Sequence, residues 1–256
     1  MQILVIDDFV LVELALAQVL QGSGHTLTGV RDPRDLPEVL AQGTRFELAL
    51  VDIDFGPGCP TGLTAMRILA EQSPGTAIVI ESTDEERNRL LFLLASFAFF
   101  TPVALMSKAS SLAEMRALID AVEVGALTGP GFAASRLSRS AGCLDELIRT
   151  KTDLMLWRAL VRFDKRGEVA RASHVDERTV DRFTAGKCAV VDRIETGFPD
   201  GPAPSAPSGS AGGTPVRHAN LLRLARFAQL HSHFFTDEAL DGLFAAHWAA
   251  PRPRHR

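Results

Sequence analysis

The chain has 256 residues, which is long enough for one full domain and a smaller one. Because 46% of its residues are hydrophobic, it can bury a substantial core. Its net charge of −4 is uneven: residues 1–130 carry an excess of nine acidic side chains, and residues 131–256 an excess of five basic ones. This asymmetry suggests two functions, one of them contact with a polyanion. Three widely spaced cysteines argue against a disulfide framework or a zinc site and fit a reducing cytoplasm better.

The first 125 residues alternate short apolar runs with amphipathic segments. The apolar runs predict strands at residues 2–6, 26–30, 48–51, 77–80 and 103–106. Between and after them, helical patterns occupy residues of about 10–20, 33–42, 62–72, 84–97 and 110–124. Unbroken apolar strands that alternate with amphipathic helices predict a parallel sheet covered on both faces.

One apolar segment requires a choice between two interpretations. Residues 90–107, LLFLLASFAFFTPVALMS, are uncharged over a length that by itself is compatible with a membrane span. Pro102 breaks this run, and the surrounding pattern accounts for it as a buried helix, a turn and a strand. Asp7 and Asp8 interrupt the first apolar stretch, which argues against a signal peptide. We therefore expect no membrane association and a cytoplasmic location.

Charged and hydroxyl side chains follow four of the five expected strands. They are Asp7 and Asp8 after the first strand, Asp52 after the third, Ser82 and Thr83 after the fourth, and Lys108 after the fifth. In a doubly covered parallel sheet, such residues meet at the carboxyl ends of the strands. Clustered carboxylates need a cation, and oxygen ligands without His or Cys suit Mg²⁺. A carboxylate in this setting can accept a phosphoryl group whose oxygens bind the metal, the lysine and a hydroxyl.

The order and spacing of these elements resemble the receiver domain of bacterial two-component response regulators over residues 1–125. The resemblance implies a flavodoxin-like, doubly wound α/β fold with a five-stranded parallel sheet. It also implies that Asp52 is the phosphoacceptor and that Mg²⁺ is the cofactor. The metal ligands would be Asp7 (through a water), Asp8, Asp52 and the backbone carbonyl of Asp54. The phosphoryl group would contact Lys108 and the switch hydroxyl of Ser82, with Thr83 as the alternative hydroxyl.

Three positions depart from the receiver pattern. Ala109 follows the lysine where the family usually has proline, as is common in the branch with LuxR-type output helices. The loop after Asp52, DFGPGCPTG, is longer than usual and rich in Gly and Pro. Leu105 occupies the position of the aromatic residue that normally reports the switch. We therefore expect phosphoryl binding to be retained and signal transmission to be unusual.

The second half of the chain predicts helices. Residues 126–149 are expected to form a connector, and residues 150–197 an all-α helix-turn-helix output domain. The apolar residues of its first helix recur at helical spacing at Leu154, Trp157, Leu160 and Val161. A short second helix is expected at residues 168–172, and Asp176 is the expected N-cap of a third helix that ends at Gly186.

The segment 167–183, GEVARASHVDERTVDRF, resembles the LuxR-type (NarL-like) output module of response regulators. In a helix-turn-helix, the second helix of the motif enters the major groove of DNA. The resemblance therefore implies DNA contacts by Arg178, Thr179, Arg182 and Lys187. Three positions depart from the pattern, and at the first two Ser173 replaces an apolar residue and His174 replaces the turn glycine. Asp181 stands where the family tends to place a base, and it would repel phosphates.

The last part of the chain has no counterpart in the usual two-domain family. Residues 198–215 are rich in Pro, Gly, Ser and Ala and are expected to form a flexible linker. Residues 216–250 contain two amphipathic helix patterns, the second with Thr236 as N-cap. We expect a helical hairpin that docks on the body of the protein or on a second subunit, followed by a basic tail at residues 251–256.

Two functions of different classes remain open. In the first, the chain is a response regulator that receives a phosphoryl group from a sensor histidine kinase or a small phosphodonor. It then forms a homodimer, binds promoter DNA and controls transcription. In the second, the receiver controls a protein–protein interaction module whose degenerate helix-turn-helix does not bind DNA. Outside the receiver there is no nucleophile–base pair or Gly-rich phosphate loop, so we expect no catalytic residues and no enzymatic activity beyond accepting and slowly losing a phosphoryl group.

Overall fold

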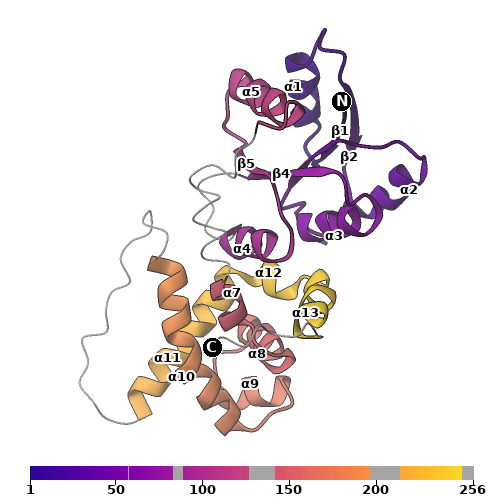
Figure 1. The fold of residues 1–256 in the computed structure, drawn as a ribbon. Coiled ribbons are helices and arrows are strands. Elements are labelled where there is room, and N and C mark those ends of the chain that lie inside the picture. The colour runs from indigo at the N-terminus through magenta and orange to yellow at the C-terminus, as the bar shows by residue number, and fades with distance from the viewer. Residues whose placement is uncertain (57, 83–88, 127–141, 197–213, 250–256) are drawn as a thin grey trace, which may run out of the picture. The chain divides into compact units, whose positions relative to one another are not determined.

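The computed structural model describes residues 1–56, 58–82, 89–126, 142–196 and 214–249. The chain divides into two compact units, Met1–Arg139 and Ser140–Arg256 (Figure 1). Most of the predicted connector (126–149) and linker (198–215), all of the tail (251–256), and Thr83 lie outside the described residues.

The first unit contains a five-stranded, all-parallel sheet with the order β2-β1-β3-β4-β5. Its strands are β1 (Gln2–Ile6), β2 (Thr26–Val30), β3 (Leu48–Asp52), β4 (Ala77–Ser82) and β5 (Ala104–Ser107). Its helices are α1 (Val10–Val19), a 3₁₀ turn η1 (Pro33–Asp35), α2 (Leu36–Ala41), α3 (Gly62–Gln72), α4 (Leu90–Phe99) and α5 (Leu112–Glu123). The predicted doubly wound α/β fold is therefore confirmed.

The two faces of the sheet are covered by different helices. On one face α1 and α5 pack together over buried residues that alternate along the strands, among them Ile3, Val5, Leu48, Leu50 and Val79. On the other face α2, α3 and α4 pack in sequence, and α3 contacts β3 (Figure 1). Apolar side chains point to both faces, which explains why the strand sequences are unbroken apolar runs. β4 extends two residues beyond its expected end, so Glu81 and Ser82 are part of the strand.

The uncharged segment at residues 90–107 is divided between two elements. It forms the ten-residue helix α4, a connection containing Pro102, and strand β5. None of the helices in the described parts of the chain has both the length and the hydropathy needed to cross a membrane. α4 begins at Leu90 in the structure, whereas the pattern predicts helix from residue 84; residues 83–88 are not described.

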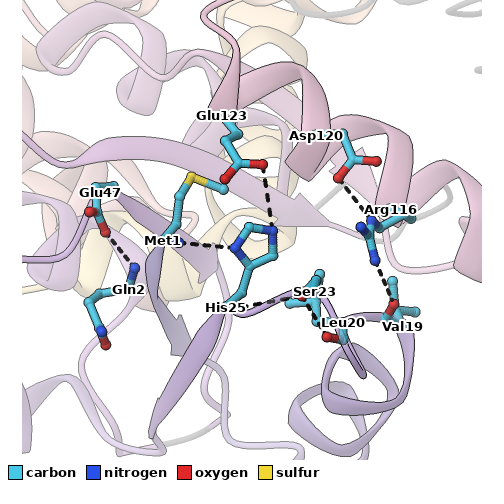
Figure 2. Close-up of polar contacts among 10 residues, drawn as sticks. All are labelled: Met1, Gln2, Val19, Leu20, Ser23, His25, Glu47, Arg116, Asp120 and Glu123. Carbon is cyan, nitrogen blue, oxygen red and sulfur yellow. Dashed lines mark hydrogen bonds and ion pairs between the residues drawn. The ribbon is translucent and has the colours of Figure 1, made fainter.

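A polar network joins the amino end of the sheet to α1 and α5 (Figure 2). The amino group of Met1 lies 3.0 Å from Nδ1 of the His25 ring, and Nε2 of that ring lies 3.7 Å from Glu123. On α5, Arg116 donates to Asp120 at 2.8 Å and to the backbone oxygen of Val19 at 3.2 Å. These contacts lie near the amino ends of the strands, whereas Asp7 and Asp52 lie at the carboxyl ends, so they stabilise the fold away from the predicted site.

The second unit is helical in its described residues. Its helices are α7 (Gly142–Leu147), α8 (Lys151–Arg162), α9 (Arg166–Ala172), α10 (Glu177–Thr196), α11 (Thr214–Leu230), α12 (Ser232–Thr236) and α13 (Ala239–Ala249). Its core is built around Trp157, which is fully buried and whose ring lies 5.1 Å from that of Phe183 and 5.0 Å from that of Phe235. The indole nitrogen of Trp157 donates to the backbone oxygen of Leu147 at 2.9 Å, so α7 joins the same core.

Helices α8, α9 and α10 have the order and turn expected of a helix-turn-helix. The backbone amide of Thr179 donates to the Asp176 side chain at 2.6 Å, which is the hydrogen bond expected if Asp176 is the N-cap residue of α10. At the turn between α9 and α10, His174 has φ = 53°, the left-handed conformation that a glycine adopts more easily. The sequence prediction that α10 ends at Gly186 is wrong, because the helix continues to Thr196.

The C-terminal helices pack within the second unit. α11 packs against α8 and α10, and α12 packs against α8. From α8, Arg158 donates to the backbone oxygens of Phe235 and Asp237 at 2.9 and 3.1 Å, which ties that helix to the end of α12. The predicted N-cap at Thr236 is wrong: Thr236 is the last residue of α12, and the Asp237 side chain instead accepts from the Ala239 amide at 2.8 Å.

Candidate functional site

The predicted site lies at the carboxyl ends of four strands, and the alternation of strand side chains decides which residues face it. On the face covered by α1 and α5, the buried positions of β1 are Ile3 and Val5, and the next in series is Asp7. The same two-residue step leads from Leu50 to Asp52 in β3, from Val79 to Glu81 in β4, and from Met106 to Lys108 after β5. Three carboxylates and one ammonium are therefore brought to one point.

Lys108 binds two of these carboxylates. Its Nζ lies 2.7 Å from Oδ2 of Asp7 and 3.0 Å from Oδ2 of Asp52. Burial acts to lower the pKa of Lys108, but the hydrogen bond that Lys108 donates to Asp7 and the charge of Asp52 outweigh this effect, and the pKa is raised. The ammonium therefore stays charged at neutral pH and holds the two carboxylates together.

Asp52 is buried at the end of β3. Its Oδ1 accepts a hydrogen bond from the Ile53 amide at 2.8 Å. Burial, opposed by the charge of Lys108 and assisted by that of Asp7, raises the pKa of Asp52 to about 6. The backbone is tightly packed here, since a Cβ at Gly62 would lie 2.2 Å from the Asp52 backbone oxygen. The position of Asp52 is therefore fixed by the strand and by the start of α3.

Further oxygen atoms lie beside this pair. One carboxylate oxygen from each of Asp7, Asp8 and Asp52 lies within 4.8 Å of the other two. Asp7 and Asp52 are buried, whereas Asp8 is exposed to solvent. Asp54 is half-buried, and its Oδ1 accepts from the Gly56 amide at 3.1 Å. This all-oxygen set with an excess of negative charge fits a hard divalent cation such as Mg²⁺.

Glu81 is a member of the site that the strand-end pattern missed. It lies opposite Asp52 in the β3–β4 register, its side chain is completely buried, and neither carboxylate oxygen has a hydrogen-bond partner. Burial, assisted by the charge of Asp7, raises the pKa of Glu81 to about 7. The sequence contained a signal for this residue, because a charged side chain in the apolar run AIVIES stands at a position where β4 faces the core.

Arg89 is a second residue that the sequence analysis missed. It is the N-cap residue of α4, and its side chain is only 11% exposed. Its Nη1 lies 3.7 Å from Oδ1 of Asp52, and its Nη2 lies 3.7 Å from Oδ2 of Asp54. No spacing rule connects position 89 with position 52, so only the tertiary structure brings this cation to the pocket.

Of the remaining residues that the receiver resemblance implies, those that the structure describes lie in β4 and β5. Ser82, the expected switch hydroxyl, is the last residue of β4 and is buried, while the alternative Thr83 is not described. Leu105 is half-buried in β5, where the family usually has its aromatic residue. The carboxyl edge therefore contains Asp7, Asp8, Asp52, Asp54, Ser82 and Lys108, as well as Glu81 and Arg89.

The predicted DNA contacts differ in their exposure. Arg178 and Arg182 are exposed on α10, one helical turn apart. Thr179 is half-buried, and its hydroxyl accepts from Nη2 of Arg182 at 3.0 Å. These three residues share the amino-terminal half of the helix, where the bases and phosphates of DNA are contacted in helix-turn-helix proteins.

The prediction of a DNA contact for Lys187 is not compatible with its position. Lys187 is buried, and its ammonium lies 2.7 Å from the Glu146 backbone oxygen and 2.8 Å from the Asp153 carboxylate. Burial lowers the pKa of Lys187, against the opposing effect of Asp153. The residue therefore joins α10 to α7 and α8 within the unit, and it is not part of the candidate interface.

Asp181 also differs from its expected role. Its carboxylate lies 3.0 Å from Nη1 of Arg166, and the same guanidinium pairs with Glu177. The negative charge that was expected to repel DNA is therefore compensated by an arginine from α9.

No family model and no curated protein matches this sequence. The chain is similar to solved structures of the RcsB response regulator. A structure of two RcsB dimers bound to two parallel DNAs has 14% sequence identity and a TM-score of 0.52, covering 88% of this chain and 98% of that one. RcsB from Salmonella enterica serovar Typhimurium, bound to promoter rprA with the phosphomimetic BeF3-, has 13% identity, a TM-score of 0.52 and the same coverage.

This similarity defines the class of fold. The chain has a fold similar to that of these RcsB structures, with a doubly wound α/β unit followed by a helical unit that contains a helix-turn-helix. At this level of identity the likeness extends to the fold alone.

Proposed function

We propose that this chain is a two-component response regulator that is phosphorylated on Asp52 and controls transcription by binding DNA. The observation that carries the proposal is the pair formed by Asp52 and Lys108, 3.0 Å apart at the carboxyl edge of a receiver-type sheet. A buried carboxylate beside an ammonium, with further carboxylates able to hold a divalent cation, is the arrangement that phosphoryl transfer to an aspartate needs.

In the proposed reaction a carboxylate oxygen of Asp52 attacks the phosphorus of a phosphohistidine on a sensor kinase, or of a small acyl phosphate. A bond forms between this oxygen and phosphorus, and the bond from phosphorus to the imidazole or acyl oxygen breaks, with its electron pair leaving on that group. Asp52 must be ionised to attack. Lys108 favours the ionised form against the effect of burial and then neutralises charge on the phosphoryl oxygens.

The carboxylates of Asp7, Asp8 and Asp52, with the backbone carbonyl of Asp54, would hold Mg²⁺. When bound, this ion supplies positive charge next to the oxygens of the transferring group. Asp7 and Lys108 would keep Asp52 in place during the reaction. Asp7 follows β1, which pairs with β3, and Lys108 follows β5, which lies on the other side of β3 beyond β4. Beyond accepting and slowly losing the phosphoryl group, we propose no enzymatic activity.

The phosphoacceptor is tested by labelling the full chain with acetyl phosphate and Mg²⁺ and measuring its intact mass. We expect one base-labile phosphoryl group on the parent and none on Asp52→Asn, which keeps the side-chain shape but removes the nucleophile. Asp35→Asn, an exposed aspartate of the same unit, is the matched control and should be labelled like the parent. Equal labelling of the Asp52 variant and the parent would exclude Asp52, and an unlabelled parent would exclude a phosphorylated receiver.

The output step of the proposal is DNA binding by α10. Its exposed residues Arg178 and Arg182 are the candidate contacts. One RcsB structure that resembles this chain contains two dimers bound to two parallel DNAs, and another contains RcsB bound to promoter rprA. By analogy we propose promoter DNA and a second copy of the chain as partners in the active state. A cytoplasmic location follows from this role.

A second candidate function is supported by the charges of the helix-turn-helix. Arg166 is paired with Asp181 and Glu177, and Lys187 is buried, so two of the basic residues near α10 are engaged within the unit. A surface with few available cations has little affinity for phosphates. In this alternative, phosphorylation of the receiver controls binding of the helical unit to a partner protein, and the chain shows no salt-dependent DNA binding.

A further inference from the structure

Arg89 and Lys108 lie on different oxygen atoms of the candidate phosphoacceptor. Lys108 lies 3.0 Å from Oδ2 of Asp52, and Arg89 lies 3.7 Å from Oδ1. The two cations come from different segments, since Arg89 lies in the connection between β4 and β5, directly before α4, and Lys108 follows β5. Asp52 is therefore flanked by a point charge on one oxygen and by a planar guanidinium on the other.

The position of Arg89 is fixed by its own burial and by the buried residues at the start of α4. Its side chain is nearly enclosed, and the residues that follow it, Leu91 and Phe92, are buried in the core of the unit. Its two terminal nitrogens face two different carboxylates, Asp52 and Asp54, at 3.7 Å each. Both distances are longer than the 2.7–2.9 Å typical of charge-assisted hydrogen bonds. The guanidinium therefore forms ion pairs with the two carboxylates but no direct hydrogen bond at these two distances.

The charge of the pocket gives this cation a chemical role. Asp7, Asp8, Asp52 and Asp54 gather at the carboxyl ends of the strands, and among the described residues Lys108 and Arg89 are cations that pair with them. Converting a carboxylate to an acyl phosphate adds negative charge and places oxygens farther out from the strand end than Oδ1 and Oδ2. A guanidinium presents several N–H donors in one plane and binds phosphoryl oxygens in pairs.

We propose that Arg89 is a second cationic ligand of the phosphoryl group, on the opposite side of Asp52 from Lys108. This inference rests on the proposed phosphorylation of Asp52. Because Arg89 directly precedes α4, it also links the phosphorylated site to that helix. The structure thus assigns to an arginine of α4 a contact that changes when the phosphoryl group is present.

The test uses beryllofluoride as a noncovalent phosphoryl mimic on the full chain. Binding is measured by titration calorimetry at saturating Mg²⁺, for the parent, Arg89→Gln, Arg89→Lys and the control Arg67→Gln. Arg67 is a partly exposed arginine of α3 paired with Glu71, so its variant removes the same charge elsewhere in the unit. We expect Arg89→Gln to weaken binding by about tenfold or more, as loss of a hydrogen bond to a charged group does. Arg89→Lys should lose less, and Arg67→Gln should match the parent.

Three outcomes would overturn the proposal in distinguishable ways. Equal binding by Arg89→Gln and the parent would show that Arg89 does not contact the phosphoryl group, with the proposed function intact. Tighter binding by Arg89→Gln would show that Arg89 instead blocks the pocket. If the parent binds no beryllofluoride and is not labelled by acetyl phosphate, both the inference and the proposed function fail. Circular dichroism of each variant identifies a misfolded one, and Arg89→Lys, which keeps the charge, then decides between the outcomes.

Discussion

The two units of this protein handle their buried charges in different ways. At the carboxyl edge of the sheet, Asp7 and Asp52 share one ammonium, and Glu81 is buried with no hydrogen-bond partner. In the helical unit, the buried Lys187 has one carboxylate and one backbone oxygen as partners. The first arrangement leaves an excess of negative charge, whereas the second is close to balanced.

The comparison shows that the balance of buried charge distinguishes a ligand-binding site from a structural contact. An excess of one charge in a buried place costs free energy unless a ligand of the opposite charge binds there. The carboxyl edge therefore points to a ligand. A balanced pair such as Lys187 with Asp153 joins helices. A buried lysine is therefore structural there, whereas Lys108 belongs to the candidate site.

The largest effect we predict would break the helical unit and leave the receiver unit unchanged. Trp157→Ala removes a fully buried ring that contacts α10, α11 and α12, and should lower the free energy of unfolding of that unit by roughly 3–5 kcal/mol. Urea unfolding followed by circular dichroism measures the loss. Acetyl phosphate labelling of the receiver should stay the same, so a variant with unaltered helical stability or with lost labelling would contradict this prediction.

The next prediction tests whether the excess charge of the pocket is real. Glu81 has its pKa raised from 4.5 to about 7, mainly by burial, so the folded protein binds a proton that the unfolded chain releases. The free energy of unfolding of the metal-free protein should therefore fall as pH rises from about 4.5 to about 7, by roughly 3 kcal/mol. Asp52, whose pKa is raised to about 6, contributes in the same direction.

Glu81→Gln should remove the share of this pH dependence that Glu81 contributes and leave the share due to Asp52, because the amide carries no charge at any pH. Stability is measured by urea unfolding in a chelator at several pH values, with Glu71→Gln on the surface of α3 as the control. An unchanged slope in the Glu81 variant would show that this carboxylate is not titrating in the folded pocket.

A smaller predicted effect tests whether the helix-turn-helix binds DNA through Arg178 and Arg182. If α10 binds DNA, replacing both Arg178 and Arg182 by Ala should weaken binding and flatten its salt dependence. Each lost phosphate contact lowers the log–log slope by roughly 0.9. If one of them reads a base edge, the loss is selective for one base pair and about 1–3 kcal/mol. Gel shifts across a salt series measure both, and a double variant that binds like the parent at every salt favours the protein-partner alternative.

The smallest effect concerns the ion pair between α9 and α10. Asp181→Asn releases Arg166 from one of its two carboxylates and should tighten non-specific DNA binding by a few-fold at low salt. Asp164→Asn, an exposed aspartate of the same unit, removes the same charge without releasing an arginine. If the two variants gain equally, the effect comes from net charge, and the Arg166 pair has no specific role.

The sequence was sufficient for the receiver unit because its signals are local and repeated. Each strand is an apolar run that ends in a polar residue, and parallel strands place those ends together. The expected strands were therefore confirmed to within two residues, and Asp7, Asp52 and Lys108 were brought together as predicted. Glu81 was missed because the expected strand ended at residue 80 and only the hydroxyls of Ser82 and Thr83 were considered after it, although strand alternation places Glu81 beside Asp52.

Tertiary structure alone decided the contacts that join distant segments. Lys187 looked like a DNA contact because it follows two arginines along α10, but the packing of α7 and α8 buries its ammonium. Gly186 looked like a helix end, yet packing of α10 against α11 carries the helix ten residues further. Arg89 reaches Asp52 only because the sheet and α4 bring them together. Sequence patterns report which face of an element is buried, whereas the partner of a long charged side chain depends on the three-dimensional arrangement of elements far apart in the chain.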